Sequence, residues 1–412
     1  MNFQLINQKL KSIGKSYWLA RDLYSRSAIS FMRLFDKKHK KRPRILFYNI
    51  MGLGYTGTDK FLQVLAKNMN KEVYDVYFMY GEQDIPSSGV HDISSRLSYI
   101  LEGKVFPIRF DYKLRQSSQP YFVEGMSPSI FDVIKDFQID LFVTAGAGNP
   151  EYPVSAIRSV PVIFINIFGE PNIQKNITNH VCISNEVADH LRTVVAKEKI
   201  KVMYVPSEGP VINSKQYGLE LRRELGLSEQ AFVFGRIGRS SEGIFDPIGI
   251  RAFQQVVKKF PHSHYLIVSP PKTLEDIVKT EKIPNVHFVK ASGKEAKLWG
   301  FYEAMDVLAH FRKDGESFGL NIVEAMFCGK PVISHRSRQW NAHLEYLDKS
   351  FSFVADTDNV GQYAAAMEFF ANPENYEKVK LMGKIARKKA FQISHISNHI
   401  GNFEKMVAGS LK

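Results

Sequence analysis

Two hydrophobic periodicities alternate along the chain, and this alternation predicts an α/β fold. After residue 43, a compact apolar run leads into a glycine turn and then into apolar residues spaced three or four positions apart, which is typical of a helix. The same unit recurs several times. The first predicted strands are RILFYNI, YDVYFMY, IDLFVTAG, VPVIFINIF and HVCISN. Strands that alternate with helices predict a parallel sheet covered on both faces.

A second series of the same kind follows a stretch rich in Pro, Ser and Gly. Its predicted strands are AFVFGRIG, HYLIVSP, NVHFVKA, VLAHF and KPVISH. We therefore expect two Rossmann-like domains facing a cleft. The expected segments are a basic amphipathic extension (1–42), an N-terminal acceptor-side domain (43–205), a linker (206–218), a C-terminal nucleotide-sugar-binding domain (219–385) and a helical tail (386–412). Ligands of open parallel sheets bind at the carboxyl ends of the strands, so the strand-to-helix loops are the candidate site.

Composition and charge exclude several function classes. No window reaches the roughly 18 consecutive apolar residues that a membrane-spanning helix needs. The only cysteines are Cys182 and Cys328, so we expect a reducing compartment and no disulfide framework. Residues 1–42 hold eleven Lys/Arg against two Asp, a net +9 of the chain's +13, which leaves +4 elsewhere. A nucleic-acid enzyme is expected to be basic over its working surface, so we expect no nucleic-acid partner.

The extension combines an apolar stripe with basic residues and has no signal-peptide pattern. The stripe is formed by Ile6, Leu10, Ile13, Tyr17, Ala20, Tyr24, Ala28, Phe31 and Phe35. Such a pattern fits a helix lying in an anionic membrane surface. The alternative is a helix docked on its own domain or on a partner. We expect a cytoplasmic protein that is peripheral on the cytoplasmic face of a membrane.

Two strand-to-helix loops contain candidate ligand-binding residues. GLGYTG, residues 52–57, satisfies G-x-G-x-x-G, and with Glu82 as a ribose acceptor it would be a dinucleotide fingerprint. It is equally a tight turn whose amides approach a phosphate or sugar. FGRIGRSSEGIFDP places Arg236 at a strand end and Arg239 in the following loop. Their guanidinium groups suit a diphosphate, with surface arginines paired to neighbouring acids as the alternative.

A third loop, GESFGLNIVEAMFCGKPVIS, sets Glu316 and Glu324 eight positions apart around a helix start. Ser317 is predicted to cap a helix that runs to about Phe327, and Gly329 to end it. Eight helical residues rise about 12 Å, comparable to the reach from a sugar ring past a diphosphate to a ribose. One carboxylate can then accept from sugar hydroxyls and the other from a ribose diol.

This third loop closely resembles the E-x7-E signature of retaining glycosyltransferases of family 4, which have the GT-B fold. LRRELGL, FVFGRIGR and YEAMDVLAHF are similar to segments that precede this signature in the family. The likeness is strong over 219–370, looser over 43–205 and absent from 1–42. It implies transfer of a sugar from a nucleotide diphosphate sugar to a hydroxyl acceptor, either a glycan or a lipid-linked glycan.

The resemblance also implies roles for individual residues. Glu316 would contact the donor sugar, Glu324 the ribose and Arg236 the diphosphate. The other implied contacts are the amides of Phe318, Gly319 and Leu320 to the sugar, Lys290 and Ser292 beside the base, and Gly54, Tyr55 and Thr56 near the phosphates and acceptor.

The chain departs from the family pattern at two places. The family usually carries a lysine five or six residues after the arginine, where this chain has Ser241 and Glu242, so Arg239 is a candidate substitute. The family also often has a histidine after the strand that matches PVIFINIFGE. That place is held here by Ile167, Phe168 and Glu170.

Two apparent metal motifs have simpler explanations. Asp356-Thr-Asp358 precedes a predicted helix, which Asp358 is expected to cap. His395 and His399 have i,i+4 spacing, but the sequence shows no third ligand nearby. We therefore predict no metal and no cofactor.

Two other function classes stay open on the sequence. A nicotinamide-dependent oxidoreductase would use the GLGYTG loop, and hydride transfer would identify it. A non-catalytic membrane-surface or carbohydrate-binding protein would keep the fold and bind a nucleotide sugar, if at all, without turnover.

Overall fold

The computed structural model describes residues 42–50, 52–81, 93–115, 122–148, 152, 154–170 and 174–412. The predicted extension lies outside these residues, apart from Arg42, and so does Glu82. Among the described residues, no helix combines the length and apolar character needed to cross a membrane.

The first domain is built on an eight-stranded sheet of order β4-β3-β2-β1-β5-β6-β7-β8. Its strands are β1 (Arg44–Asn49), β2 (Asp75–Gly81), β3 (Phe106–Arg115), β4 (Phe122–Ser127), β5 (Leu141–Gly146), β6 (Val162–Asn166), β7 (Ile177–Cys182) and β8 (Ile200–Val202). Among the strand pairs of the described residues in this sheet, β3–β4 is antiparallel and the others are parallel. Its helices are α3 (Gly57–Asn68), α4 (Ile93–Glu102), α5 (Ile130–Asp136) and α6 (Asn185–Leu191). The five strands predicted for this domain are β1, β2, β5, β6 and β7, whereas β3, β4 and β8 were not predicted.

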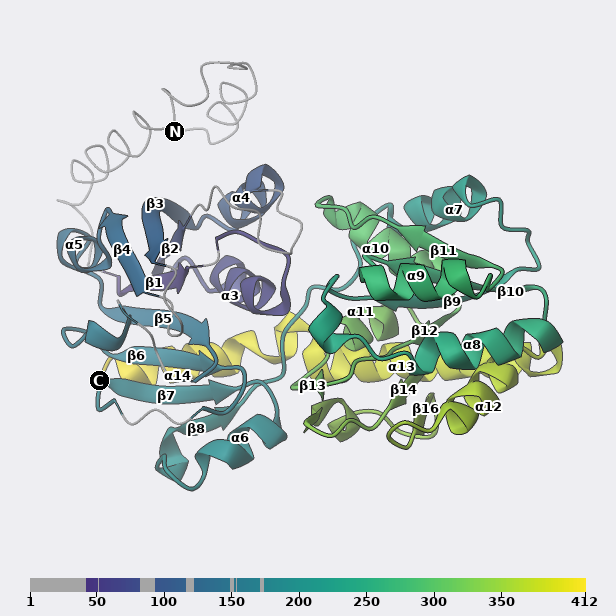
Figure 1. Cartoon of the computed structure of the whole chain (residues 1–412). Helices are drawn as coiled ribbons and strands as arrows, with labels where there is room; N and C mark the ends of the chain where they lie inside the picture. The colour runs from purple at the N-terminus through teal and green to yellow at the C-terminus, as the bar shows by residue number, and fades with distance from the viewer. Residues whose placement is uncertain are drawn as a thin grey trace, which may run out of the picture.

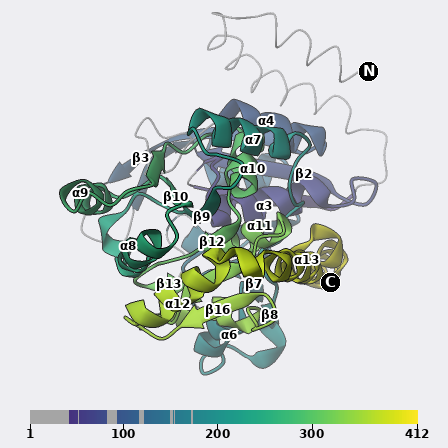
Figure 2. The same cartoon turned by 90° about the vertical axis from the view of Figure 1, so that its right-hand side faces the viewer.

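The second domain contains a six-stranded parallel sheet of order β11-β10-β9-β12-β14-β16. Its strands are β9 (Phe232–Ile237), β10 (Ser263–Val268), β11 (Val286–Val289), β12 (Val307–Ala309), β14 (Val332–His335) and β16 (Ser352–Ala355). Its helices are α7 (Ser214–Glu224), α8 (Ile248–Lys259), α9 (Lys272–Thr280), α10 (Glu295–Ala304), α11 (Leu320–Phe327) and α12 (Val360–Ala371). Helix α7 packs on α10 and α8 on α12, with the sheet between these groups (Figure 2). The first residues of α7 fall within the predicted linker 206–218.

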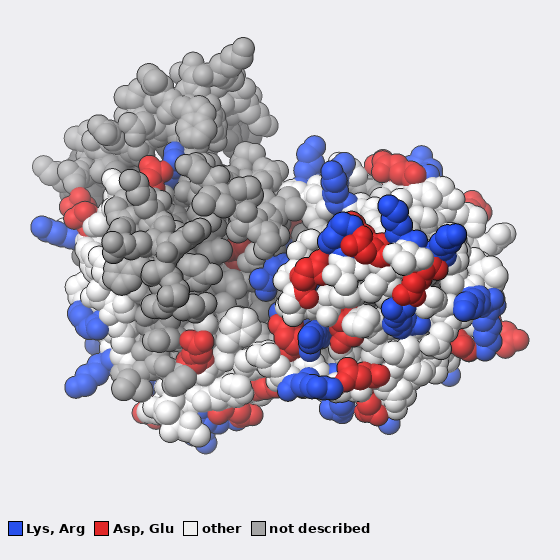
Figure 3. Space-filling view, in the orientation of Figure 1, with Lys and Arg blue, Asp and Glu red and all other residues white. Residues whose placement is uncertain are grey.

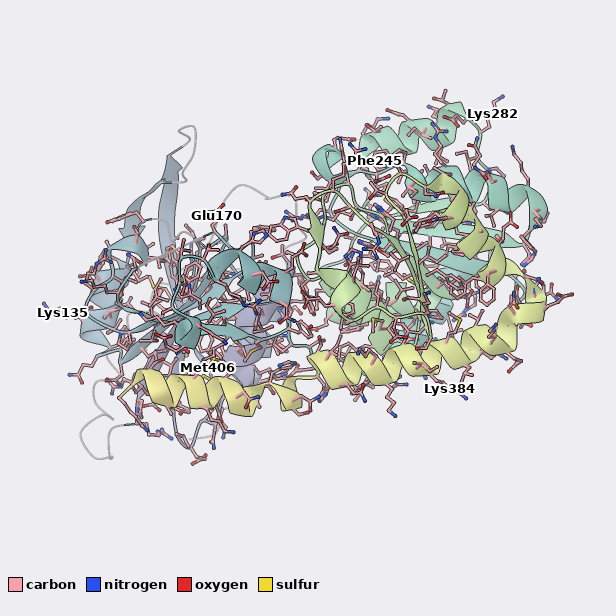
Figure 4. The ribbon with its side chains drawn as sticks, turned by 90° about the horizontal axis from the view of Figure 1, so that it is seen from below. Lys135, Glu170, Phe245, Lys282, Lys384 and Met406 are labelled. Atoms are coloured by element: carbon pink, nitrogen blue, oxygen red, sulfur yellow. The ribbon has the colours of Figure 1, made fainter. Side chains whose placement is uncertain are left out.

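Two C-terminal helices, α13 (Tyr376–Ser394) and α14 (Ile400–Ser410), run along both domains. Figures 1 and 4 show α13 alongside the second domain and α14 alongside the first. The Phe391 ring of α13 lies 5.0 Å from the Phe327 ring, and the Phe403 ring of α14 lies 6.1 Å from the Phe47 ring of β1. Within the described residues, the chain therefore crosses between its domains twice, once at the linker and once between these two helices.

Helix capping corrects one sequence prediction. Ser184 caps α6, because its side chain accepts a hydrogen bond from the Val187 amide at 3.1 Å. Asp358 does not cap α12. The cap is Asn359, which accepts from the Gln362 amide at 3.0 Å. Asp358 instead has a φ of +59° and forms an ion pair with Arg338 at 2.7 Å.

Candidate functional site

Helix α11 begins at a glycine turn. Gly315 and Gly319 have φ values of +72° and +90°, a region that favours glycine. A Cβ at Gly315 would lie 1.8 Å from the carbonyl oxygen of Trp340, so that position excludes any side chain. The N-cap is Gly319 and no side chain caps the helix, so the predicted cap at Ser317 is wrong. The left-handed turn at Gly319 places the helix start at Leu320, beyond Ser317. The predicted end is correct, with Gly329 at a φ of +70° just beyond it.

The starts of α3 and α11 meet across the boundary between the domains. A Cβ on Gly57, the first residue of α3, would lie 3.7 Å from Cδ2 of Leu320, the first residue of α11. The loop before α3 is a capped turn, since Thr56 and Asp59 form a capping box. Gly52 has a φ of +88°, and a Cβ there would lie 2.7 Å from the Gly81 carbonyl oxygen. Gly52 and Thr56 of the GLGYTG loop thus have structural roles that do not depend on a ligand.

Glu324 lies on α11 and accepts hydrogen bonds at both carboxylate oxygens. Tyr302 of α10 donates its hydroxyl to Oε2 at 2.7 Å. Lys60 of α3 donates from Nζ to Oε1. The Lys60 and Glu324 side chains are 8% and 6% exposed, so this ion pair between the two domains is buried. Glu324 therefore faces the first domain, at the boundary where the sequence places a cleft.

Glu316 lies in the short strand β13 (Gly315–Glu316), which pairs with β15 (Trp340–Asn341). Its Oε1 is 3.4 Å from His310 Nε2, and its Oε2 is 3.5 Å from Arg312 Nη1. Burial raises the pKa of the Glu316 carboxyl, and Arg312 opposes that rise. Burial also lowers the pKa of His310 well below its usual value, so this imidazole is neutral at neutral pH. Arg312 is thus the charged neighbour of the Glu316 carboxylate in this cluster.

Arg236, near the end of β9, is 2% exposed. Its Nε and Nη1 are buried and have no hydrogen-bond partner among the described residues. The guanidinium lies over the Phe311 ring, 4.9 Å from its centroid, and a Cβ on Gly238 would lie 2.7 Å from Arg236 Cζ. Burial lowers the pKa of Arg236 to about 10, and Glu316 is among the groups that oppose this. A buried guanidinium with unused donors is the kind of group that an anionic ligand satisfies.

The loop after Arg236 points mainly to solvent. Arg239 is exposed, although its charge acts on the Glu316 carboxyl. Glu242 is exposed as well, and it accepts a hydrogen bond from the Thr273 amide at the start of α9, at 3.1 Å. Arg236 and Arg239 are both candidates for diphosphate binding on the sequence. Of these two, only Arg236 is buried at the site.

The other residues that the sequence predicts to contact the nucleotide sugar lie at the start of α11 and in the loop after β11. Lys290 is exposed, and the Ser292 hydroxyl accepts from the Lys294 amide at 3.2 Å, just before α10. The carbonyl oxygens of Phe318 and Gly319 accept from the Tyr346 hydroxyl at 2.6 Å and 3.2 Å. Tyr346 thus fixes the turn that presents the first amides of α11.

A cavity of about 420 Å³ lies between the domains beside Glu324. Its lining includes Lys60, Arg96, Tyr99, Glu295, Trp299 and Glu324. Across it, Lys60 and Arg96 of the first domain meet Glu324 and Glu295 of the second. Arg96 of α4 pairs with Glu295 of α10 at 2.8 Å, in addition to the Lys60–Glu324 pair.

Several residues at the site were not found from the sequence. They are Lys60, Arg96, Tyr302, His310, Arg312 and Tyr346. His310 lies near the carboxyl end of the predicted strand VLAHF and directly follows the observed strand β12, which was a usable signal because strand ends face the site. Lys60 and Arg96 lie within helices of the other domain, and nothing in their local sequence marks them.

The two apparent metal motifs are occupied by other contacts. Among the described residues, no group of three or more His, Cys, Asp or Glu side chains is arranged to hold a metal ion. His395 donates to or accepts from the Ser397 hydroxyl at 2.7 Å, and His399 contacts the Ile393 carbonyl at 2.7 Å.

Figure 3 shows basic and acidic side chains interspersed over the viewed face of the second domain.

Comparison with known proteins identifies the second domain. Residues 220–389 match the family model "Glycosyl transferases group 1". This part of the chain is a glycosyltransferase group 1 domain. It contains Arg236, Glu316 and Glu324, together with α10 and α11. A curated D-inositol 3-phosphate glycosyltransferase from Corynebacterium kroppenstedtii is 26% identical over 188 residues, which is 43% of this chain and 40% of that protein. The chain thus matches less than half the length of this relative.

Solved structures extend the likeness beyond the group 1 domain to the whole architecture. A glycosyltransferase from Rickettsia africae is similar at a TM-score of 0.64 and 13% identity, covering 90% of this chain and 100% of that one. Anabaena Alr3699/HepE in complex with UDP and glucose is similar at a TM-score of 0.65 and 18% identity, covering 89% and 100%. At these identities the likeness is one of fold. The protein has the GT-B fold, as the sequence predicts.

Proposed function

We propose that this protein is a retaining glycosyltransferase of family 4 that uses a nucleotide diphosphate sugar. The observation that carries the proposal is the buried guanidinium of Arg236, with unused donors, in a group 1 domain near Glu316. A diphosphate offers pairs of negative oxygens that the planar fork of a guanidinium can bind through two parallel hydrogen bonds. The structures of HepE with UDP and glucose, and with UDP-glucose, support a donor of this class.

Each site residue is assigned to one part of the bound nucleotide sugar. Glu316 accepts hydrogen bonds from the sugar hydroxyls and Glu324 from the ribose. Arg236 holds the diphosphate, with Arg239 as a weaker, exposed contributor in place of the family lysine. The donor is further contacted by the amides of Phe318, Gly319 and Leu320, by Lys290 and Ser292 beside the base, and by Gly54, Tyr55 and Thr56 near the phosphates and acceptor.

Transfer takes place on the face from which the leaving group departs. The bond between sugar and phosphate loosens toward an oxocarbenium-like state, and the acceptor hydroxyl approaches from the same side. The leaving phosphate oxygen takes the acceptor proton, so no separate general base is required. Arg236 and the amides at the start of α11 stabilise the charge that develops on the diphosphate, where one donor contributes about 3 kcal/mol. The reaction needs neither a metal nor a cofactor.

The acceptor is a hydroxyl of a glycan or a lipid-linked glycan. A basic amphipathic extension of residues 1–42 would hold the enzyme on the cytoplasmic face of an anionic membrane, within reach of a lipid-linked acceptor. The extension lies outside the described residues, so this part of the proposal rests on its sequence pattern.

A nucleotide-release assay tests the proposal. The protein is incubated with UDP-, GDP- and ADP-sugars, with and without EDTA, and the released nucleoside diphosphate is measured. We expect release with one nucleotide class, insensitive to EDTA and lost in Arg236→Met. The anomeric configuration of the transferred sugar, read by NMR, should match that of the donor. Inversion of the configuration would contradict a retaining mechanism, and reduction of a nicotinamide instead of nucleotide release would contradict the transferase itself.

A further inference from the structure

Lys60 lies on helix α3 of the first domain, and its side chain reaches a carboxylate of the second. Its Nζ donates to Glu324 Oε1, and the side chain is 8% exposed. An ammonium group has three donors. Among the described residues Glu324 is its hydrogen-bond acceptor, and the Trp299 ring centroid is 5.9 Å away. We propose that Lys60 supplies a second cation for the diphosphate of the donor, delivered by the domain that does not hold the nucleotide.

The position of Lys60 fits this role. Gly57 and Leu320, the first residues of α3 and α11, lie against each other across the domain boundary. Lys60 and Glu324 lie three and four residues further on, which is about one helical turn behind that contact. A diphosphate at the start of α11 would therefore lie about one turn from Nζ, within range of the flexible four-carbon stem of lysine.

Glu324 can keep Lys60 while it binds a ribose. An ionised carboxylate has about four lone-pair sites, of which Lys60 and Tyr302 occupy two. Ribose hydroxyls can take the others. The remaining donors of Lys60 then point to the phosphate that follows the ribose, so that one ammonium bridges Glu324 and the donor.

Charge balance favours the same assignment. A diphosphate brings about two negative charges into the site, and Arg236 is the buried cation of the second domain there. The other basic residues of the interface already have dedicated partners, since Arg96 pairs with Glu295 at 2.8 Å and Lys67 with Glu208 at 3.2 Å. The partner of Lys60, by contrast, is the proposed ribose acceptor itself. Donor binding would thus strengthen the contact between the domains and couple binding to closure of the site.

The inference rests on the proposed function, and binding measurements separate the two. UDP, GDP and ADP, and the matching nucleosides, are titrated calorimetrically into the wild-type protein, and the tightest diphosphate is carried forward. Lys60→Met removes the charge and the donor. Lys60→Gln removes the charge but keeps a donor for Glu324, which protects against misfolding. Lys60→Arg keeps the charge. Lys67→Met, on the same helix, is the matched control for loss of a partly buried cation.

We expect Lys60→Met and Lys60→Gln to bind the nucleoside diphosphate about 10- to 100-fold more weakly, the range that loss of one charge-assisted hydrogen bond gives. Affinity for the nucleoside should change by less than about 3-fold, and Lys60→Arg and Lys67→Met should resemble the wild type. Equal weakening of nucleoside and diphosphate would mean that Lys60 merely positions Glu324, and unchanged or tighter diphosphate binding would also overturn the inference. A wild-type protein that binds none of the three diphosphates would instead refute the proposed function.

Discussion

Arg236→Met should make the protein more stable while it removes donor binding. The reason is that Arg236 is 2% exposed and its Nε and Nη1 lack partners among the described residues. A buried charge whose donors are not hydrogen-bonded destabilises the folded state. Methionine fills similar space against Phe311 without that charge. The substitution should therefore raise the stability of the folded state and remove the group that binds the diphosphate.

The size of the effect follows from the pKa of the guanidinium. Lowering of the pKa from 12.5 to about 10 corresponds to a few kcal/mol against folding, since each unit is worth about 1.36 kcal/mol. The folded chain holds this proton less tightly than the unfolded chain does, so the penalty is fully present below about pH 10. Loss of the contact with the Phe311 ring offsets about 1 kcal/mol of the gain. We therefore expect a net stabilisation of about 2 kcal/mol.

Thermal unfolding at neutral pH and calorimetric titration of the nucleoside diphosphate measure the two effects. For a domain of this size, 1 kcal/mol shifts the midpoint by about 2–4 °C. Diphosphate binding should weaken by about 10-fold or more. Arg239→Met is the matched control, because Arg239 is exposed and its removal should leave the midpoint unchanged. An Arg236→Met protein that unfolds earlier than the wild type, and still binds the diphosphate normally, would refute the reasoning.

Four further predictions concern the carboxylates, acid stability and the extension. Glu324→Gln should bind the nucleotide sugar about 10- to 100-fold more weakly in calorimetry, since the ribose loses a charged acceptor; equal affinity would contradict that role. Glu316→Gln should lower kcat more than donor affinity, and an intact kcat would rule out its contact with the sugar. Folding stability should fall as the pH drops from 6.5 to about 4, because burial lowers the pKa of His343 to about 4 and the unfolded chain takes up the proton first. Urea unfolding of His343→Asn should show a shallower fall across that window, and a slope equal to that of the wild type would contradict it. Removal of residues 1–40 should abolish sedimentation with anionic liposomes but spare donor hydrolysis; full-length protein that stays in the supernatant at low salt would contradict membrane binding.

Local periodicity explains which elements of the fold could be predicted. The strands β1, β2, β5, β6 and β7 are apolar runs bounded by turns, and each is recognisable within its own few residues. Strand β3 was missed although its sequence, FPIRFDYKLR, alternates apolar and charged residues, which is a strand signal. The end of α11 was likewise local, because glycine at 329 takes the left-handed conformation that stops a helix.

The start of α11 and the cap of α12 depended on backbone geometry that the sequence leaves open. Ser317 and Asp358 are both good capping residues. The turn at Gly319 moves the first helix start beyond Ser317. The left-handed backbone of Asp358 and its pairing with Arg338 give the second cap to Asn359. Neighbouring residues with similar propensities are distinguished only by the path of the chain around them.

The sequence by itself determined the two α/β domains and, through the E-x7-E spacing, the pair Glu316 and Glu324, because both depend on residues close together in the chain. The tertiary structure decided which charges these carboxylates meet. Lys60 pairs with Glu324 over 264 residues, and nothing around either residue encodes the other. Arg236 appears in the sequence as one arginine of two, yet only the packing of β9 against Phe311 leaves it buried with unused donors. Burial and pairing across a domain boundary depend on how two separately folded sheets come together, and that is a property of the whole chain.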